Sequence, residues 1–116
     1  DGAHNVSGAE QLAKFLKKEN KNTWLIIGML NHKNIILFLR TIKKYIKGVI
    51  AIKIPDEKNA FTEIEIHKVC KKLNIACVEK QNTSAAKSYL LQNIHPERIL
   101  VTGSLYLIAK IRKLFI

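Results

Sequence analysis

The sequence lacks long hydrophobic runs and a leader-like start. No apolar stretch approaches the roughly 20 residues that a membrane-spanning helix needs. No basic segment followed by an apolar segment and a small-residue cleavage site is present. Internal repeats, low-complexity tracts and long linkers are also missing. We therefore expect a soluble, cytoplasmic protein without a membrane partner.

Cysteine is scarce, and no residues form a pattern typical of metal sites. The only cysteines are Cys70 and Cys77, and their spacing matches neither a zinc knuckle nor a redox pair. We interpret both as buried free thiols without a chemical role. His32, His67 and His95 have no pairing that suggests a metal site, and we interpret them as solvated side chains. The sequence thus predicts no metal ligands.

The chain is short, apolar and strongly basic. With 116 residues, 47% of them hydrophobic, it can build one compact core but not two. The net charge of +11 raises nucleic acid as a partner. However, most of the basic residues fall at predicted helix C-ends, where the helix dipole favours cations. The richness in Lys, Ile and Asn also looks like low-GC coding, so nucleic acid is only a minor alternative. The basic groups at helix ends are Lys17, Lys18, Lys21, Lys43, Lys44, Lys47, Lys71, Lys72, Lys110, Arg112 and Lys113.

Helical and strand patterns alternate along the whole chain. Capping boxes formed by Ser7 with Glu10 and by Thr62 with Glu65 mark two helix starts. Helical spacing predicts further helices over 35–46, stopped by Gly48, and over 83–94 and 105–115. Short apolar runs predict strands, the first of them covered on both faces, over 23–28, 49–54, 75–78 and 98–101. The alternation predicts an α/β fold with a mostly parallel sheet and right-handed crossovers.

Three segments fall at predicted strand-to-helix junctions. They are Asp1 to Ser7, Gly28 to Asn34 and Thr102 to Ser104. In a parallel α/β sheet these junctions share one edge, and ligands bind along it. The first segment also places an acid, a glycine and an imidazole at the mouth of a helix, where nucleotides and anions are held. We expect the functional site on this edge.

The same segments carry a family resemblance. Asp1-Gly2-Ala3-His4-Asn5 and Thr102-Gly103-Ser104-Leu105-Tyr106 closely resemble the two signature motifs of the C-terminal domain of folylpolyglutamate synthase/dihydrofolate synthase, within the ATP-dependent Mur ligase superfamily. The segment 28–34 resembles that family's Gly-Met-Leu-x-Asp-Lys-Asp loop. The three motifs agree in order and spacing, so the resemblance covers essentially the whole chain. The departures are Val6 for a Pro, His32 and Asn34 for two acids, and Ala109 for a common Gly.

The resemblance implies a fold and a domain organisation. It implies a Rossmann-like, mostly parallel β-sheet with helices on both faces, of the Mur ligase C-terminal domain type. Residues 1–116 would be a single glutamate-ligase domain, with the N-terminal ATPase domain absent from this chain. Because Asp1 opens the chain without an initiator Met, we expect a piece of a longer protein whose first strand is truncated.

The resemblance also implies a reaction in folate biosynthesis and one-carbon metabolism. The full enzyme ligates L-glutamate to a folate or dihydropteroate carboxylate. ATP first converts that carboxylate to an acyl phosphate, and the glutamate amine then attacks it with Mg2+ present. ATP and Mg2+ would be bound mainly by the N-terminal domain. This chain has no Gly-x-x-x-x-Gly-Lys-[Ser/Thr] phosphate loop, so we expect the isolated chain to fold but to be inactive.

Four residues take roles from the resemblance. Asp1 would hydrogen-bond the ribose or adenine end of ATP, and His4 would lie by the nucleotide and the reaction centre as a catalytic residue. Lys33 would add a cation at the ATP-binding rim, and Ser104 would hold the incoming glutamate. Taken alone, Asp1 also fits a frayed terminus, His4 a surface imidazole and Ser104 a helix N-cap.

Two other functions stay open at this point. A peptidoglycan Mur ligase C-terminal domain would share the fold and the ATP chemistry, although the segment 102–106 argues against it. A free-standing basic α/β module for nucleic acid is the alternative from a different class.

Overall fold

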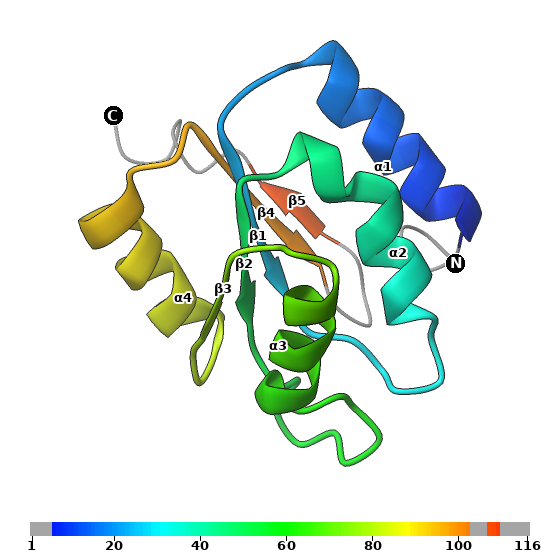
Figure 1. Ribbon diagram of the computed structural model, residues 1–116. Helices are drawn as coiled ribbons and strands as arrows, with labels where there is room; N and C mark the ends of the chain where they lie inside the picture. The colour runs from blue at the N-terminus through cyan, green and yellow to red at the C-terminus, as the bar shows by residue number, and fades with distance from the viewer. Residues whose placement is uncertain (1–5, 103–106, 110–116) are drawn as a thin grey trace.

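The protein is built on a five-stranded sheet with the strand order β3-β2-β1-β4-β5 (Figure 1). The computed structural model describes residues 6–102 and 107–109. Four strands run parallel and β5 pairs antiparallel with β4, which confirms the predicted mostly parallel sheet. The strands are β1 (Thr23–Ile27), β2 (Gly48–Ala51), β3 (Cys77–Glu79), β4 (Arg98–Thr102) and β5 (Leu107–Ala109).

Helices cover both faces of the sheet, as predicted. Three of them pack on one face and α4 lies on the other (Figure 1). A 3-10 turn, η2, extends α2, and a π-helical turn, η3, extends α4. The bounds are α1 (Val6–Lys18), α2 (Ile35–Ile42), η2 (Lys43–Tyr45), α3 (Glu63–Lys72), α4 (Thr83–Tyr89) and η3 (Leu90–Ile94).

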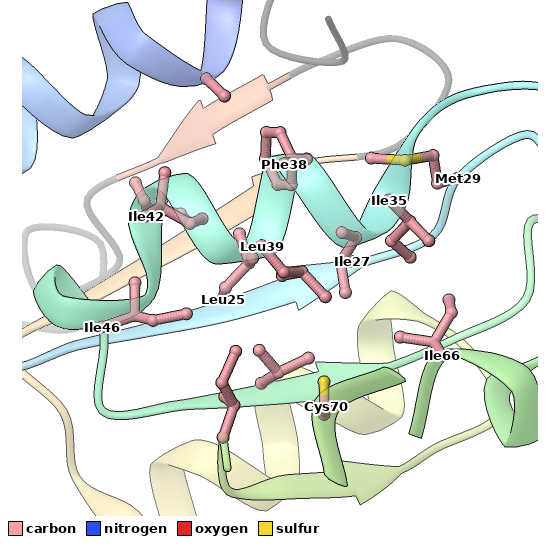
Figure 2. Close-up of a cluster of buried hydrophobic side chains, with 14 of the residues drawn as sticks. Leu25, Ile27, Met29, Ile35, Phe38, Leu39, Ile42, Ile46, Ile66 and Cys70 are labelled. Atoms are coloured by element: carbon pink, nitrogen blue, oxygen red, sulfur yellow. The ribbon is translucent and has the colours of Figure 1, made fainter. Parts of the chain in front are cut away.

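Burial of the central strand β1 on both faces explains why its sequence does not alternate between apolar and polar residues. All five of its residues are buried. Leu25 and Ile27 point into a large cluster with α1, α2 and α3, shown in Figure 2. Trp24 and Ile26 point into a second, smaller cluster with α4 and η3. A strand covered on both faces is expected to be apolar, and every residue of β1 except Thr23 is.

A buried arginine joins three elements at the edge where the strands begin. The side chain of Arg98, at the start of β4, is only 1% exposed. Its Nε donates to Thr23 Oγ1 at 3.0 Å, and its Nη2 donates to the Glu19 carbonyl oxygen at 2.6 Å. Burial lowers the pKa of Arg98, while the nearby carboxylates of Glu19 and Glu97 oppose that shift. The guanidinium also lies 5.1 Å from the ring centre of Phe15. Arg98 therefore holds β4, β1 and the end of α1 together.

The helix ends agree with the predicted caps and charges in most places. At α3, Glu65 N donates to Thr62 Oγ1 at 3.1 Å and Thr62 N donates to Glu65 Oε1 at 2.8 Å, which confirms the capping box. The first helix begins at Val6, so Ser7 lies inside its first turn and the prediction that Ser7 precedes the helix is wrong. Basic residues occupy the last turns of α1, η2 and α3, as predicted.

Two predicted elements differ from the structure. The predicted helix over 105–115 is wrong over 107–109, because Leu107–Ala109 forms β5 beside β4. A short apolar run fits a buried helix or a strand equally well, and the free edge of β4 selects the strand. Gly48 was predicted to stop the second helix, but it opens β2 opposite Trp24. The helix itself ends earlier, at Ile42.

We expect Arg98→Ala to lower the free energy of unfolding by about 2–4 kcal/mol, because it removes hydrogen bonds from a charged donor and leaves a cavity. Urea denaturation followed by circular dichroism measures the change. Lys18→Ala, an exposed basic residue near the same helix end, is the matched control and should change stability by less than about 0.5 kcal/mol. Equal losses in the two variants would contradict the role assigned to Arg98.

We expect Gly48→Ala to destabilise the fold by about 1–3 kcal/mol through overpacking. A Cβ atom at Gly48 would lie 2.5 Å from Trp24 Cζ3, which forces the indole to move. The same substitution made in a Trp24→Leu background should cost less, since the clash is gone. A double-mutant cycle by urea denaturation tests this coupling, and additive losses would contradict it.

Candidate functional site

The edge formed by the carboxyl ends of the strands brings together two of the three predicted site segments. Gly28 N, just after β1, donates to the Thr102 carbonyl oxygen at the end of β4, at 3.0 Å. The start of the 28–34 loop therefore touches the start of the last motif. The helices α1 and α2 begin at this same edge (Figure 1). Asp1, His4 and Ser104 lie outside the described residues.

The 28–34 loop is fixed by the segment that follows β2. Asn31 N donates to the Asn59 carbonyl oxygen at 2.7 Å, and Phe61 N donates to the Met29 carbonyl oxygen at 2.9 Å. Met29 is completely buried, so it anchors the loop in the core. Gly28 is tightly enclosed, because a Cβ atom there would lie 3.1 Å from Ile54 Cγ1. The loop is thus a rigid platform for the residues at its tip.

Lys33 stands at the positive end of a helix. Its backbone N donates to the Leu30 carbonyl oxygen at 3.1 Å, which closes a turn immediately before α2. Asn34 Oδ1 accepts from Leu37 N at 3.0 Å and caps the helix. The first turn of α2 contains no acidic residue. The half-buried Lys33 and the helix dipole therefore both favour an anion at this tip.

A groove opens beside this tip, between the start of α2 and α3. Its volume is about 400 Å³. One side carries the loop residues and the other is apolar, and Ile36 on its wall is 41% exposed. Seven residues line the groove: His32, Lys33, Asn34, Ile35, Ile36, Phe61 and Val69. A cation beside an apolar wall suits a ligand with an anionic group and an apolar body.

Two further hollows lie near the starts of α3 and α4, and both include Glu63 and Gln81. One has a volume of about 360 Å³ and also contains Glu79 and Lys80. The other has a volume of about 420 Å³ and contains Asp56 and Lys53. The Lys53 ammonium already donates to the Glu57 carbonyl oxygen at 2.8 Å. Carboxylates in both hollows make them less suitable for an anion than the groove beside Lys33.

In residues 6–102 and 107–109, no group of three or more His, Cys, Asp or Glu side chains could hold a metal ion. His32 and His95 are exposed, as predicted. His67 was interpreted as simply solvated, but its Nδ1 lies 2.8 Å from Glu79 Oε2 and the two side chains form a pair.

No helix in the described part is long and apolar enough to cross a membrane.

Sequence patterns missed the residues that form the far wall of the groove. Phe61 and Val69 come from a segment about thirty residues after Lys33 and meet it only because α2 and α3 pack together. Val69 is half-buried. The one usable signal was Ile36, which α2 leaves on its exposed side. Its position does not fall at the helical spacing of the buried residues of α2.

Known structures share this fold. Helicobacter pylori folylpolyglutamate synthetase matches with a TM-score of 0.68 and 19% identity, over 90% of this chain and 25% of that chain. The Yersinia pestis bifunctional folylpolyglutamate synthase/dihydrofolate synthase complexed with AMPPNP and Mn ion matches with a TM-score of 0.73 and 14% identity, over 90% and 25%. E. coli FolC in complex with ADP matches with a TM-score of 0.69 and 20% identity, again over 90% and 25%.

This chain spans about a quarter of the length of those proteins. At these identities the likeness shows the fold, which is the Mur ligase C-terminal type expected from the sequence. No curated protein matches the chain significantly. A family model described as dihydrofolate synthetase, C-terminal domain, matches residues 1–114. This match covers all three sequence motifs, so the chain belongs to the family of dihydrofolate synthetase C-terminal domains.

Proposed function

We propose that this chain is the C-terminal domain of an ATP-dependent enzyme that joins L-glutamate to a folate or dihydropteroate carboxylate. The family match over residues 1–114 carries the proposal. A bifunctional folylpolyglutamate synthase/dihydrofolate synthase that shares the fold has been solved with Mn, AMPPNP and L-glutamate bound, which supports the same ligands here. The cation and apolar wall beside the 28–34 loop fit a nucleotide.

ATP would meet this domain at the groove. Lys33 and the start of α2 supply positive charge for a phosphate oxygen. His32 and Asn34 replace the two acids of the family loop, so no carboxylate of this loop repels the phosphates. Asp1 would bind the ribose or adenine end, His4 would act near the reaction centre, and Ser104 would hold the incoming glutamate.

The chain's own contribution to the chemistry is orientation and shielding. Bound ATP supplies the phosphoryl group that activates the carboxylate toward the amine of glutamate. The apolar wall formed by Ile36 and Phe61 would keep water from that activated group. By the family resemblance, Mg2+ would be held mainly by the rest of the protein.

An N-terminal ATPase domain would complete the site. Two large apolar side chains of the described residues are exposed: Ile36 on the wall of the groove, at 41%, and Ile64 on α3, at 56%. Exposed apolar side chains beside a ligand groove are typical of a surface that packs against another domain. Since this chain spans about a quarter of its structural relatives, we propose that the ATPase domain of the same protein closes over the groove.

We expect the full-length protein to release ADP when given ATP, L-glutamate and dihydropteroate or folate. The 116-residue chain alone should release no ADP and form no glutamylated product, because it has no phosphate loop. A coupled ADP assay with mass analysis of the glutamylated product measures both. Turnover with UDP-muramyl substrates instead would reassign the protein to the peptidoglycan ligases. Ligase activity of the isolated chain would contradict its dependence on a second domain.

In the full-length protein, we expect Lys33→Gln to raise the KM for ATP by about tenfold, the effect of about 1.4 kcal/mol of lost charge-assisted binding. The KM for glutamate should stay within about twofold, because Lys33 is assigned to the nucleotide alone. Lys43→Gln, an exposed lysine at the opposite edge, is the matched control and should leave both constants unchanged. A Lys33→Gln enzyme with unaltered ATP kinetics would remove Lys33 from the site.

A further inference from the structure

The turn after α3 brings the two cysteines to the same place. The helix ends at Lys72 with Leu73 as its C-cap, and Asn74 takes a left-handed conformation with a φ of 59°. Ile75 N then donates to the Cys70 carbonyl oxygen at 2.9 Å, and Asn74 N donates to the Lys71 carbonyl oxygen at 3.2 Å. This bonding pattern is a Schellman motif, which reverses the chain over the helix end. Only Ala76 lies between Ile75 and Cys77, so the reversed chain brings Cys77 back toward Cys70.

Both side chains enter the same side of the sheet. Cys77 is the strand partner of Val49, whose side chain belongs to the large buried cluster under α1, α2 and α3. Cys70 projects from α3 into that cluster and is completely buried, as Figure 2 shows. Cys77 packs against the same cluster from β3 but is only half-buried. The interpretation of both cysteines as buried free thiols is confirmed for Cys70, whereas Cys77 is free but only half-buried.

The two thiols are chemically unequal. A hydrogen bond from the Cys70 thiol lowers the pKa of Cys77, against the opposing effects of burial and of Glu79. The same hydrogen bond, together with burial, raises the pKa of Cys70. The thiolate form is the nucleophile, so the accessible Cys77 is the thiol that reacts first and the buried Cys70 is its protonated neighbour.

We propose that Cys70 and Cys77 are a peroxide-reactive thiol pair that oxidises to a disulfide linking α3 to β3. This site is separate from the groove beside Lys33 and from the proposed ligase activity. A partly exposed cysteine next to a second, buried thiol is an arrangement found in redox-sensitive proteins. The oxidant class is a hydroperoxide, with hydrogen peroxide as the simplest member.

The reaction balances in two steps. The Cys77 thiolate attacks one oxygen of hydrogen peroxide, so an S–O bond forms, the O–O bond breaks, and hydroxide leaves and takes up a proton as water. The Cys70 sulfur then attacks the Cys77 sulfenic acid, so the S–S bond forms and the S–O bond breaks. The hydroxyl group departs with the Cys70 proton as a second water. Two thiols are oxidised and one peroxide is reduced.

The test treats the full chain with equimolar hydrogen peroxide at neutral pH, then blocks free thiols and digests with trypsin without reduction. We expect the loss of both free thiols. The digest should contain one species in which Val69–Lys71 is linked to Leu73–Lys80, and a reductant should separate the two peptides. Recovery of both peptides in blocked form, or of oxidised Cys77 beside blocked Cys70, overturns the proposal.

Two variants test the assigned order of reaction without relying on the disulfide itself. In Cys70→Ala, Cys77 should form a sulfenic acid that dimedone traps, with no linked peptide. In Cys77→Ala, Cys70 should remain unmodified under the same exposure, because it is completely buried. Dimedone labelling of Cys70 in that variant at the rate seen for Cys77 would contradict the order. Circular dichroism establishes whether each variant is folded. If a variant does not fold, the peptide map of the wild-type chain alone tests the proposal.

Discussion

The buried guanidinium of Arg98 is the interaction on which the layered arrangement depends. It lies where β1 and β4 begin and where α1 ends, three segments that are far apart in the sequence. A charge in the interior is tolerated only when hydrogen bonds replace its water. Thr23 and the Glu19 carbonyl supply those bonds for Nε and Nη2, the Glu19 carboxylate lies 3.9 Å from Nη1, and the Phe15 ring lies beside the guanidinium. Arg98 thereby fixes β4 beside β1 and fixes the end of α1 at the same edge of the sheet. The groove forms at the opposite edge.

Much of the fold follows from local sequence signals. The unbroken apolar run of β1 predicted a strand buried on both faces, and its side chains do alternate between two clusters. The reciprocal hydrogen bonds of Thr62 and Glu65 were predictable because a capping box depends on residues only three apart. The segment around 107–109 was not predictable in this way. Its pairing depends on the edge of β4, which the local pattern does not contain.

The residues of the candidate site also fall into two groups, those that a local sequence signal predicts and those that depend on tertiary packing. Lys33 could be predicted because it belongs to a contiguous motif, and the structure places it on the groove. Phe61 and Val69 could not, since they reach the groove through the packing of two helices. The contact between Cys70 and Cys77 was missed for a related reason. Their separation in sequence is uninformative until the left-handed Asn74 turns the chain back. Asp1, His4 and Ser104 stay predictions.

The lysines at the helix C-ends give the domain a marked electrical polarity. They collect at the edge where the strands begin, while the groove lies at the other. The domain measures 37 × 28 × 25 Å, which exceeds the Debye length of about 8 Å at physiological ionic strength. Inside a cell the groove is therefore screened from the basic edge. In dilute buffer the same lysines attract any triphosphate, so nucleotide titrations at low ionic strength report two ends of the molecule at once.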